Sequence, residues 1–105
     1  MSEANDLVQG VREALREVID PEIGFNIVDI GLIYDISVDE GGIVRITMTT
    51  TTKGCPATNY LWEGAGEAAQ SVAGVQGVDV LLTYDPPWSP DMMSAVANDI
   101  LGGGW

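Results

Sequence analysis

The residue of this chain best suited to chemistry is its one cysteine, Cys55, in the segment Thr-Thr-Lys-Gly-Cys-Pro. The thiolate form of cysteine is both a nucleophile and a metal ligand. Pro56 is typical of the first turn of a helix, where unpaired N–H groups and the helix dipole favour negative charge. Lys53 adds positive charge, and Gly54 leaves the thiol uncrowded. The sequence therefore predicts a readily ionised, functional thiol; the alternative is a cysteine packed without function at a loop.

Further polar residues stand on either side of a proline and before the cysteine. The hydroxyls of Thr51 and Thr52 can hydrogen-bond a thiolate or a cluster sulfide, although the β-propensity of threonine explains them equally well. Asp20 and Glu22 flank Pro21. They are either a carboxylate pair for proton transfer or metal ligation, or part of a turn after the first helix.

The segment Asp-Pro-Pro-Trp at residues 85–88 predicts a rigid loop. Trp88 is either presented to a partner protein or folded back over the core. The chain has no histidine, which excludes Cys–His catalysis within one chain. One cysteine is also too few for an ordinary Cys/His zinc site, and no phosphate-binding glycine loop is present.

The spacing of apolar residues predicts the elements that position these groups. Residues 26–32 are expected to pack and to turn into the first strand. The predicted elements are a helix over residues 5–18, ended by Pro21; strands over 33–38 and 43–51 joined by a turn at 39–42; a helix over 56–73; a strand over 78–84; and a short helix over 89–101, broken near Ser94.

This order, α-β-β-α-β-α, predicts an α+β fold with two layers: a small mixed three-stranded sheet with helices mainly on one face. The connection after the second strand is long enough for a helical crossover, so the third strand is expected to run parallel to the second. With 105 residues, the chain is expected to form one domain over residues 1–105.

The charge balance restricts the partners. Sixteen acidic and four basic residues give a net charge of −12, which disfavours nucleic acid and anionic membranes. No apolar run is long enough to span a membrane, and the polar, acidic start does not resemble a secretory signal, so a cytoplasmic location is expected. The acidity indicates either a basic partner or adaptation to a salty cytoplasm.

Four segments occur in this order along the chain: Asp20-Pro21-Glu22-Ile23-Gly24, Asn26-Ile27-Val28-Asp29-Ile30-Gly31-Leu32-Ile33-Tyr34, Thr51-Thr52-Lys53-Gly54-Cys55-Pro56 and Asp85-Pro86-Pro87-Trp88-Ser89-Pro90 with Met92-Met93-Ser94. Together they resemble the metal–sulfur (iron–sulfur) cluster assembly factor family, which includes SufT and the phenylacetate-pathway protein PaaD. One departure is that PaaD-type proteins continue into a cysteine-rich region, whereas this sequence stops at Trp105, which favours a general assembly factor.

The resemblance implies an iron–sulfur cluster assembly domain that carries clusters to client proteins, or acts as an adaptor in their delivery, without being an enzyme. It implies that Cys55 binds the cluster, with possible support from Asp20 and Glu22. Thr51 and Thr52 belong to the same implied pocket, which Gly54 is expected to line, and Trp88 is expected to bind a partner. The implied partners are iron–sulfur carriers and clients.

Elementary coordination chemistry limits that role. An iron–sulfur cluster normally has four protein ligands, mostly cysteine thiolates, and one chain offers one. We therefore expect no stably bound cluster, but a transient one shared across a homodimer, or docking of a carrier and a client without metal. The alternatives are a protein-interaction module with a structural Cys55, and a thiol-dependent enzyme with Asp20 or Glu22 as base.

Overall fold

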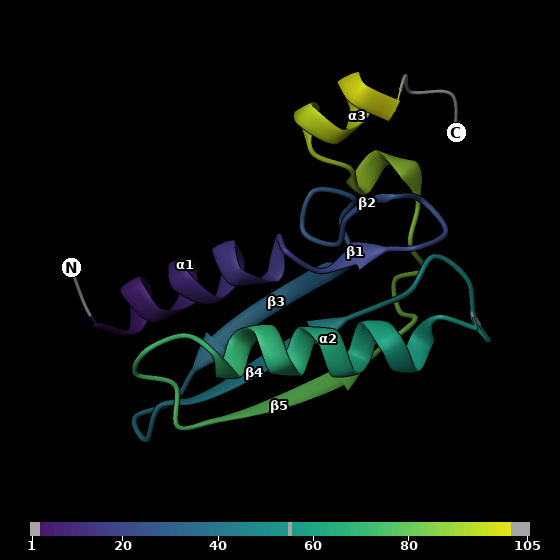
Figure 1. The fold of residues 1–105 in the computed structure, drawn as a ribbon. Helices are drawn as coiled ribbons and strands as arrows, with labels where there is room; N and C mark the ends of the chain where they lie inside the picture. The colour runs from purple at the N-terminus through teal and green to yellow at the C-terminus, as the bar shows by residue number, and fades with distance from the viewer. Residues whose placement is uncertain (1–2, 55, 102–105) are drawn as a thin grey trace.

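The computed structural model describes residues 3–54 and 56–101. These residues form a small α+β fold with a mixed three-stranded sheet, as predicted (Figure 1). A separate two-stranded sheet and a 3₁₀ helix, η1, accompany it. The elements are α1 (Glu3–Leu15), β1 (Ile19–Asp20), β2 (Phe25–Asn26), β3 (Ile33–Val38), β4 (Ile43–Met48), α2 (Thr58–Gln70), β5 (Gly77–Leu82), η1 (Pro90–Met92) and α3 (Ala95–Leu101).

The main sheet has the strand order β3-β4-β5. β3 and β4 form the predicted antiparallel hairpin, and β5 runs parallel to β4 after the crossover through α2, which confirms the expectation. At the hairpin turn, one carboxylate oxygen of Asp39 accepts hydrogen bonds from the N–H groups of Gly41 and Ile43, at 2.8 and 3.0 Å. This turn fixes the register that places the alternate residues of β4 in the core.

Helices α1 and α2 cover one face of the sheet. α1 packs on β3, α2 packs on β5, and the two helices contact each other. On the other face, Ser37, Arg45 and Asp79 lie side by side on the three strands and are exposed. The fully buried apolar side chains of the core are Val11, Leu15, Ile27, Ile30, Leu32, Val44, Ile46, Met48, Leu61, Ala65, Ala69 and Ala97.

Two helix boundaries differ from the prediction. α1 ends at Leu15 rather than near Val18, because successive N–H groups from Arg16 to Val18 bond the carbonyl three residues earlier, which tightens the chain into turns. Residues 19–20 then pair with 25–26, a short sheet that the sequence did not predict. α2 spans Thr58–Gln70, two residues later and three earlier than expected.

The C-terminal segment packs against residues 26–32, in which Ile27, Ile30 and Leu32 are fully buried and the others half-buried. The predicted break near Ser94 is confirmed. The Ser94 N–H donates to the backbone oxygen of Asp29 at 2.7 Å, and its hydroxyl accepts from the Ala97 N–H at the start of α3. No described helix is long and apolar enough to cross a membrane.

Asp29 also anchors this region through its carboxylate. Asn26 donates a 2.8 Å side-chain hydrogen bond to it, and the Arg16 guanidinium lies 3.5 Å away. The Asn26 hydrogen bond is the main cause that holds the pKa of Asp29 below its ordinary 3.8; partial burial opposes it, and Ser94 and Arg16 assist it. The ionised form is therefore the one that the fold stabilises.

Replacing Asp29 by asparagine is expected to lower the free energy of unfolding at pH 7 by roughly 1–2 kcal/mol, because charge-assisted hydrogen bonds are lost. A lowered folded-state pKa stabilises the fold above the unfolded value of 3.8, and this contribution is lost as the pH falls through the folded-state value. The difference in the free energy of unfolding between the two proteins should therefore become smaller below pH 3.8. Urea unfolding at pH 7 and pH 3 measures this difference. A difference that does not change with pH would contradict a stabilising role of the ionised Asp29 carboxylate.

Candidate functional site

The loop between β4 and α2 carries most of the predicted site, and its threonines begin inside the protein. Thr49 and Thr50 are buried, Thr51 is half-buried and Thr52 is exposed. The hydroxyl of Thr50 donates to the backbone oxygen of Thr52 at 2.7 Å. The buried hydroxyls thus stabilise the loop backbone from below, while the chain emerges to the surface toward Cys55, which itself lies outside the described residues.

Tyr84, which the sequence placed only in a strand, belongs to this loop region. Its hydroxyl lies 2.9 Å from the hydroxyl of Thr50, and the ammonium nitrogen of Lys53 lies 5.7 Å from the centre of its ring. These contacts join the chain after β4 to the chain after β5. The signal in the sequence is an aromatic residue at the end of the last strand pattern, directly before the Asp-Pro-Pro-Trp segment.

The helix after the loop begins later than predicted. The residue before Thr58 is Ala57, whose backbone lies outside a capping conformation and whose side chain makes no capping hydrogen bond. Cys55 therefore precedes the first helical residue by three positions. The helix dipole acts mainly within the first turn, so the support for a thiolate from this helix is weaker than the sequence suggested. Gly54 is exposed and lies in a turn with φ +74°, a conformation that favours glycine.

The predicted carboxylate pair is divided between two environments. Asp20 is 1% exposed, whereas Glu22 is exposed. One oxygen of Asp20 accepts the Glu22 backbone N–H at 2.8 Å, which forms the predicted turn. Its other oxygen is buried with no hydrogen-bond partner, the one such side-chain atom found in the described part of the chain. A buried, unpartnered carboxylate oxygen is unusual and is a ready acceptor for a proton or a metal ion.

Strand β1, which ends at Asp20, and the threonine loop lie toward the same end of the main sheet, where β3 begins and β4 ends (Figure 1). A backbone hydrogen bond links the start of the threonine loop to the segment before β3: the Thr49 N–H donates to the Leu32 oxygen at 2.9 Å. Within residues 3–54 and 56–101, no three acidic, cysteine or histidine residues gather closely enough to hold a metal ion. The described residues of the acidic segment and of the threonine loop thus share one end of the fold, and they form no closed metal cage there.

Trp88 takes the second of its two predicted positions. Its indole N–H donates to the Ile30 backbone oxygen at 2.7 Å, and the half-buried ring packs against the core. Beside it, the Tyr34 hydroxyl donates to the Pro86 oxygen at 2.8 Å, and burial raises the pKa of Tyr34 although Thr49 opposes the shift. A shallow cavity of about 530 Å³ lies here, lined by Val28, Gly31, Ile33, Tyr34, Pro86 and Met92.

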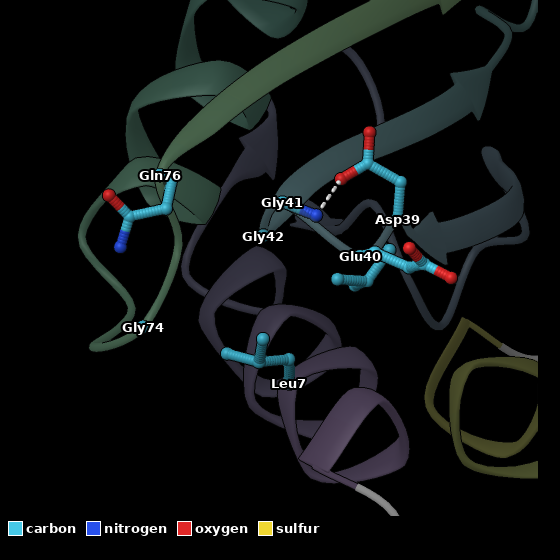
Figure 2. A pocket seen from close by; sticks show the side chains of 8 residues that line it. Leu7, Asp39, Glu40, Gly41, Gly42, Gly74 and Gln76 are labelled. Atoms are coloured by element: carbon cyan, nitrogen blue, oxygen red, sulfur yellow. Dashed lines mark hydrogen bonds between the residues drawn. The ribbon is translucent and has the colours of Figure 1, made fainter.

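A second cavity, of about 380 Å³, lies at the opposite end of the sheet (Figure 2). Leu7 of α1, Asp39 and Glu40 of the hairpin turn, and Gln76 before β5 surround it. β4 starts at this end and finishes at the threonine loop, so the six residues of β4 separate the two by about 17 Å. This cavity is therefore not part of the predicted site.

Comparison with known proteins is informative at the level of the whole chain. The model of the family described as "Iron-sulfur cluster assembly protein" matches residues 9–81. An "Fe-S protein maturation auxiliary factor" of Porphyromonas gingivalis is 47% identical over 88 residues, 84% of each chain. YitW of Bacillus subtilis, which has the same description, is 39% identical over 96 residues, 91% of this chain and 94% of its own.

The architecture agrees with these matches. The crystal structure of a domain of unknown function, DUF59, from Bacillus anthracis superposes with a TM-score of 0.89 at 35% identity, covering 94% of both chains. Sequence and fold thus lead to the same conclusion, and the matched range includes both the acidic segment at Asp20 and the loop with Cys55. The chain belongs to the iron–sulfur cluster assembly protein family.

Proposed function

We propose that this protein serves in the maturation of iron–sulfur proteins, as a carrier of clusters or an adaptor in their delivery, and that Cys55 is the residue through which it acts. The observation that carries the proposal is the family match over residues 9–81, which contains the one thiol of the chain. Relatives described as iron–sulfur maturation factors, similar over most of their own length, support the same role.

The chemistry proposed for Cys55 is reversible ligation of a cluster that is cargo rather than a resident cofactor. One thiolate per chain is one of the four ligands that a cluster normally has. A homodimer supplies two, and the remaining positions are left to carboxylates or to thiols of the carrier or client. Incomplete ligation by the protein favours release, which is what delivery requires.

Each described residue near the cysteine has a part in this proposal. The buried hydroxyl of Thr50 holds the loop by bonding the Thr52 backbone. Thr51, Thr52 and Gly54 line the pocket around the thiol, and Lys53 offsets the negative charge of a thiolate-bound cluster. The unpartnered oxygen of Asp20 is a second acceptor, for a proton or for iron, at the same end of the sheet.

Anaerobic reconstitution with iron and sulfide tests the proposal. Because the thiol supply is incomplete, we expect the wild type to be colourless as isolated and to acquire at most a labile, sub-stoichiometric cluster. The cluster should be lost to a chelator and should transfer to an apo-ferredoxin added in excess. The measurements are visible absorbance, iron and sulfide per chain, and mass by light scattering before and after loading.

Cys55→Ser is the matched variant, since it replaces the sulfur atom by oxygen with little change in shape. It should neither acquire nor transfer a cluster under the same conditions. A stoichiometric cluster in each monomer that resists the chelator and persists in Cys55→Ser would refute the role proposed for this residue.

A further inference from the structure

A groove between α2 and β5 lies on the open edge of the main sheet. β5 is the last strand of that sheet and α2 runs along it (Figure 1). The groove has a volume of about 300 Å³. Its walls are Trp62, Glu63, Gly66 and Glu67 from α2, and Val78, Asp79 and Val80 from β5.

Trp62 forms a fixed aromatic wall of this groove. Its indole N–H donates to the Val80 backbone oxygen at 3.0 Å, so the ring is held over the strand edge although the residue is 43% exposed. Gly66 lies one helical turn further on and leaves the space beside the ring open. A Cβ atom at position 66 would lie 3.9 Å from a methyl carbon of Val80, which is an ordinary contact. An alanine could therefore occupy this position without a clash, and the space is open only because residue 66 has no side chain.

The rim of the groove carries negative charge that no ion pair among the described residues neutralises. Glu63 and Glu67 are exposed and stand four residues apart on α2, a spacing at which like charges repel each other. The two ion pairs found in the described residues both use Arg16, which pairs with Glu13 and Asp29 instead. A positive charge brought by another molecule would relieve the repulsion that the chain itself leaves in place.

We propose that this groove binds an arginine or lysine side chain from a partner protein. The cation faces the Trp62 ring, where a cation–π contact forms, and pairs with Glu63 and Glu67. Its aliphatic stem packs over Val78 and Val80. Two exposed apolar residues stand near the groove residues in the sequence, Tyr60 two positions before Trp62 and Leu82 two positions after Val80, and they favour partner segments in which apolar residues flank the basic one. The proposal deepens the adaptor role proposed above and rests on it for the kind of partner.

A titration with the peptides acetyl-Leu-Arg-Leu-amide and acetyl-Leu-citrulline-Leu-amide, followed by ¹⁵N NMR at low salt, tests it. The arginine peptide should shift the Trp62 indole N–H and the amides of residues 62–67 and 78–80 with saturation. The uncharged citrulline peptide should bind at least about tenfold more weakly, since it lacks the cation. Comparable binding of both peptides would overturn the proposal.

Two variants distinguish binding in the groove from a general effect of the negative charge of the protein. Gly66→Ala should weaken binding of the arginine peptide several-fold by filling the opening, without lowering the melting temperature, because alanine favours a helix over glycine. Glu63→Gln with Glu67→Gln should weaken it by about tenfold or more. The matched control, Asp39→Asn with Glu40→Gln, removes the same charge at the far cavity and should leave the affinity near that of the wild type.

Several results would contradict the proposal: equal loss in the control and the groove variant, shifts spread over all acidic surfaces, or wild-type affinity in Gly66→Ala. If the chain sedimented as a dimer and Trp62 lay in the dimer interface, the groove would be assigned to a second copy of the chain instead. The experiment contains no iron and does not involve Cys55. Its failure would thus leave cluster transfer intact, and a failure of cluster transfer would leave peptide binding intact.

Discussion

A chain in which Cys55 is replaced by alanine is expected to melt like the wild type and to fail completely in iron–sulfur protein maturation. The described neighbours of Cys55 in the sequence, Gly54 and Pro56, are both exposed. We expect truncation of a small side chain between two exposed residues to remove little buried area, with a loss of stability of at most about 1 kcal/mol. The functional loss is total because the chain has no second thiol.

Thermal unfolding and complementation of a strain that lacks its own assembly factor measure the two effects. Ser37→Ala provides the control, since it truncates a small exposed side chain on the open face of the sheet and should complement normally. Normal complementation by Cys55→Ala would reject the cysteine as the functional centre and leave docking of partners as the role. A large drop in melting temperature would instead make the cysteine a structural residue.

The largest loss of stability is expected from Gly31→Ala. Gly31 has φ +87°, and a Cβ atom there would lie 2.8 Å from the carbonyl carbon of Met92 and against its oxygen. The new methyl group would have to displace backbone, not a flexible side chain. We expect the free energy of unfolding to fall by about 3 kcal/mol or more, through strain at this position and loss of the packing around it.

Gly24→Ala separates the two causes. Gly24 has nearly the same φ, +79°, but a Cβ atom there meets nothing within 4 Å. Only the backbone strain remains in Gly24→Ala, so the free energy of unfolding should fall by about 1–2 kcal/mol. Urea unfolding of both variants gives the comparison. Equal costs would show that the close approach of Met92 to residue 31 contributes nothing, and that the C-terminal segment can move away without loss.

The main sheet was predictable because its patterns are strong and repeated. Val44, Ile46 and Met48 alternate with polar residues, and the Asp-Glu-Gly-Gly turn fixes the hairpin before them. The β1–β2 sheet was not predictable, because two residues per strand are too few to produce a period. Asp20 gave a correct signal for a turn, but no repeated pattern in the sequence indicates the backbone pairing of β1 with β2 around it.

The sequence could propose residues for the candidate site but not their arrangement. The sequence singled out Cys55 and Asp20, yet it could not show that one oxygen of Asp20 is buried without a partner. It offered Thr51 and Thr52 as strand formers or as pocket residues, and it did not single out Thr50, whose hydroxyl bonds both the loop backbone and Tyr84. Such hydroxyl contacts depend on how two chain segments meet, and no local pattern encodes them.

The mixed strand order also bears on how the chain reaches its native state. The β3–β4 hairpin closes over a short turn, but β5 can join β4 only after the intervening α2 has crossed over. Contacts between distant segments form late because loop closure must precede them. During synthesis the hairpin therefore emerges before α2 and β5, with one edge of β4 unpaired and without the cover that α2 provides. In this interval the nascent chain is most prone to aggregate, and the high net negative charge opposes self-association.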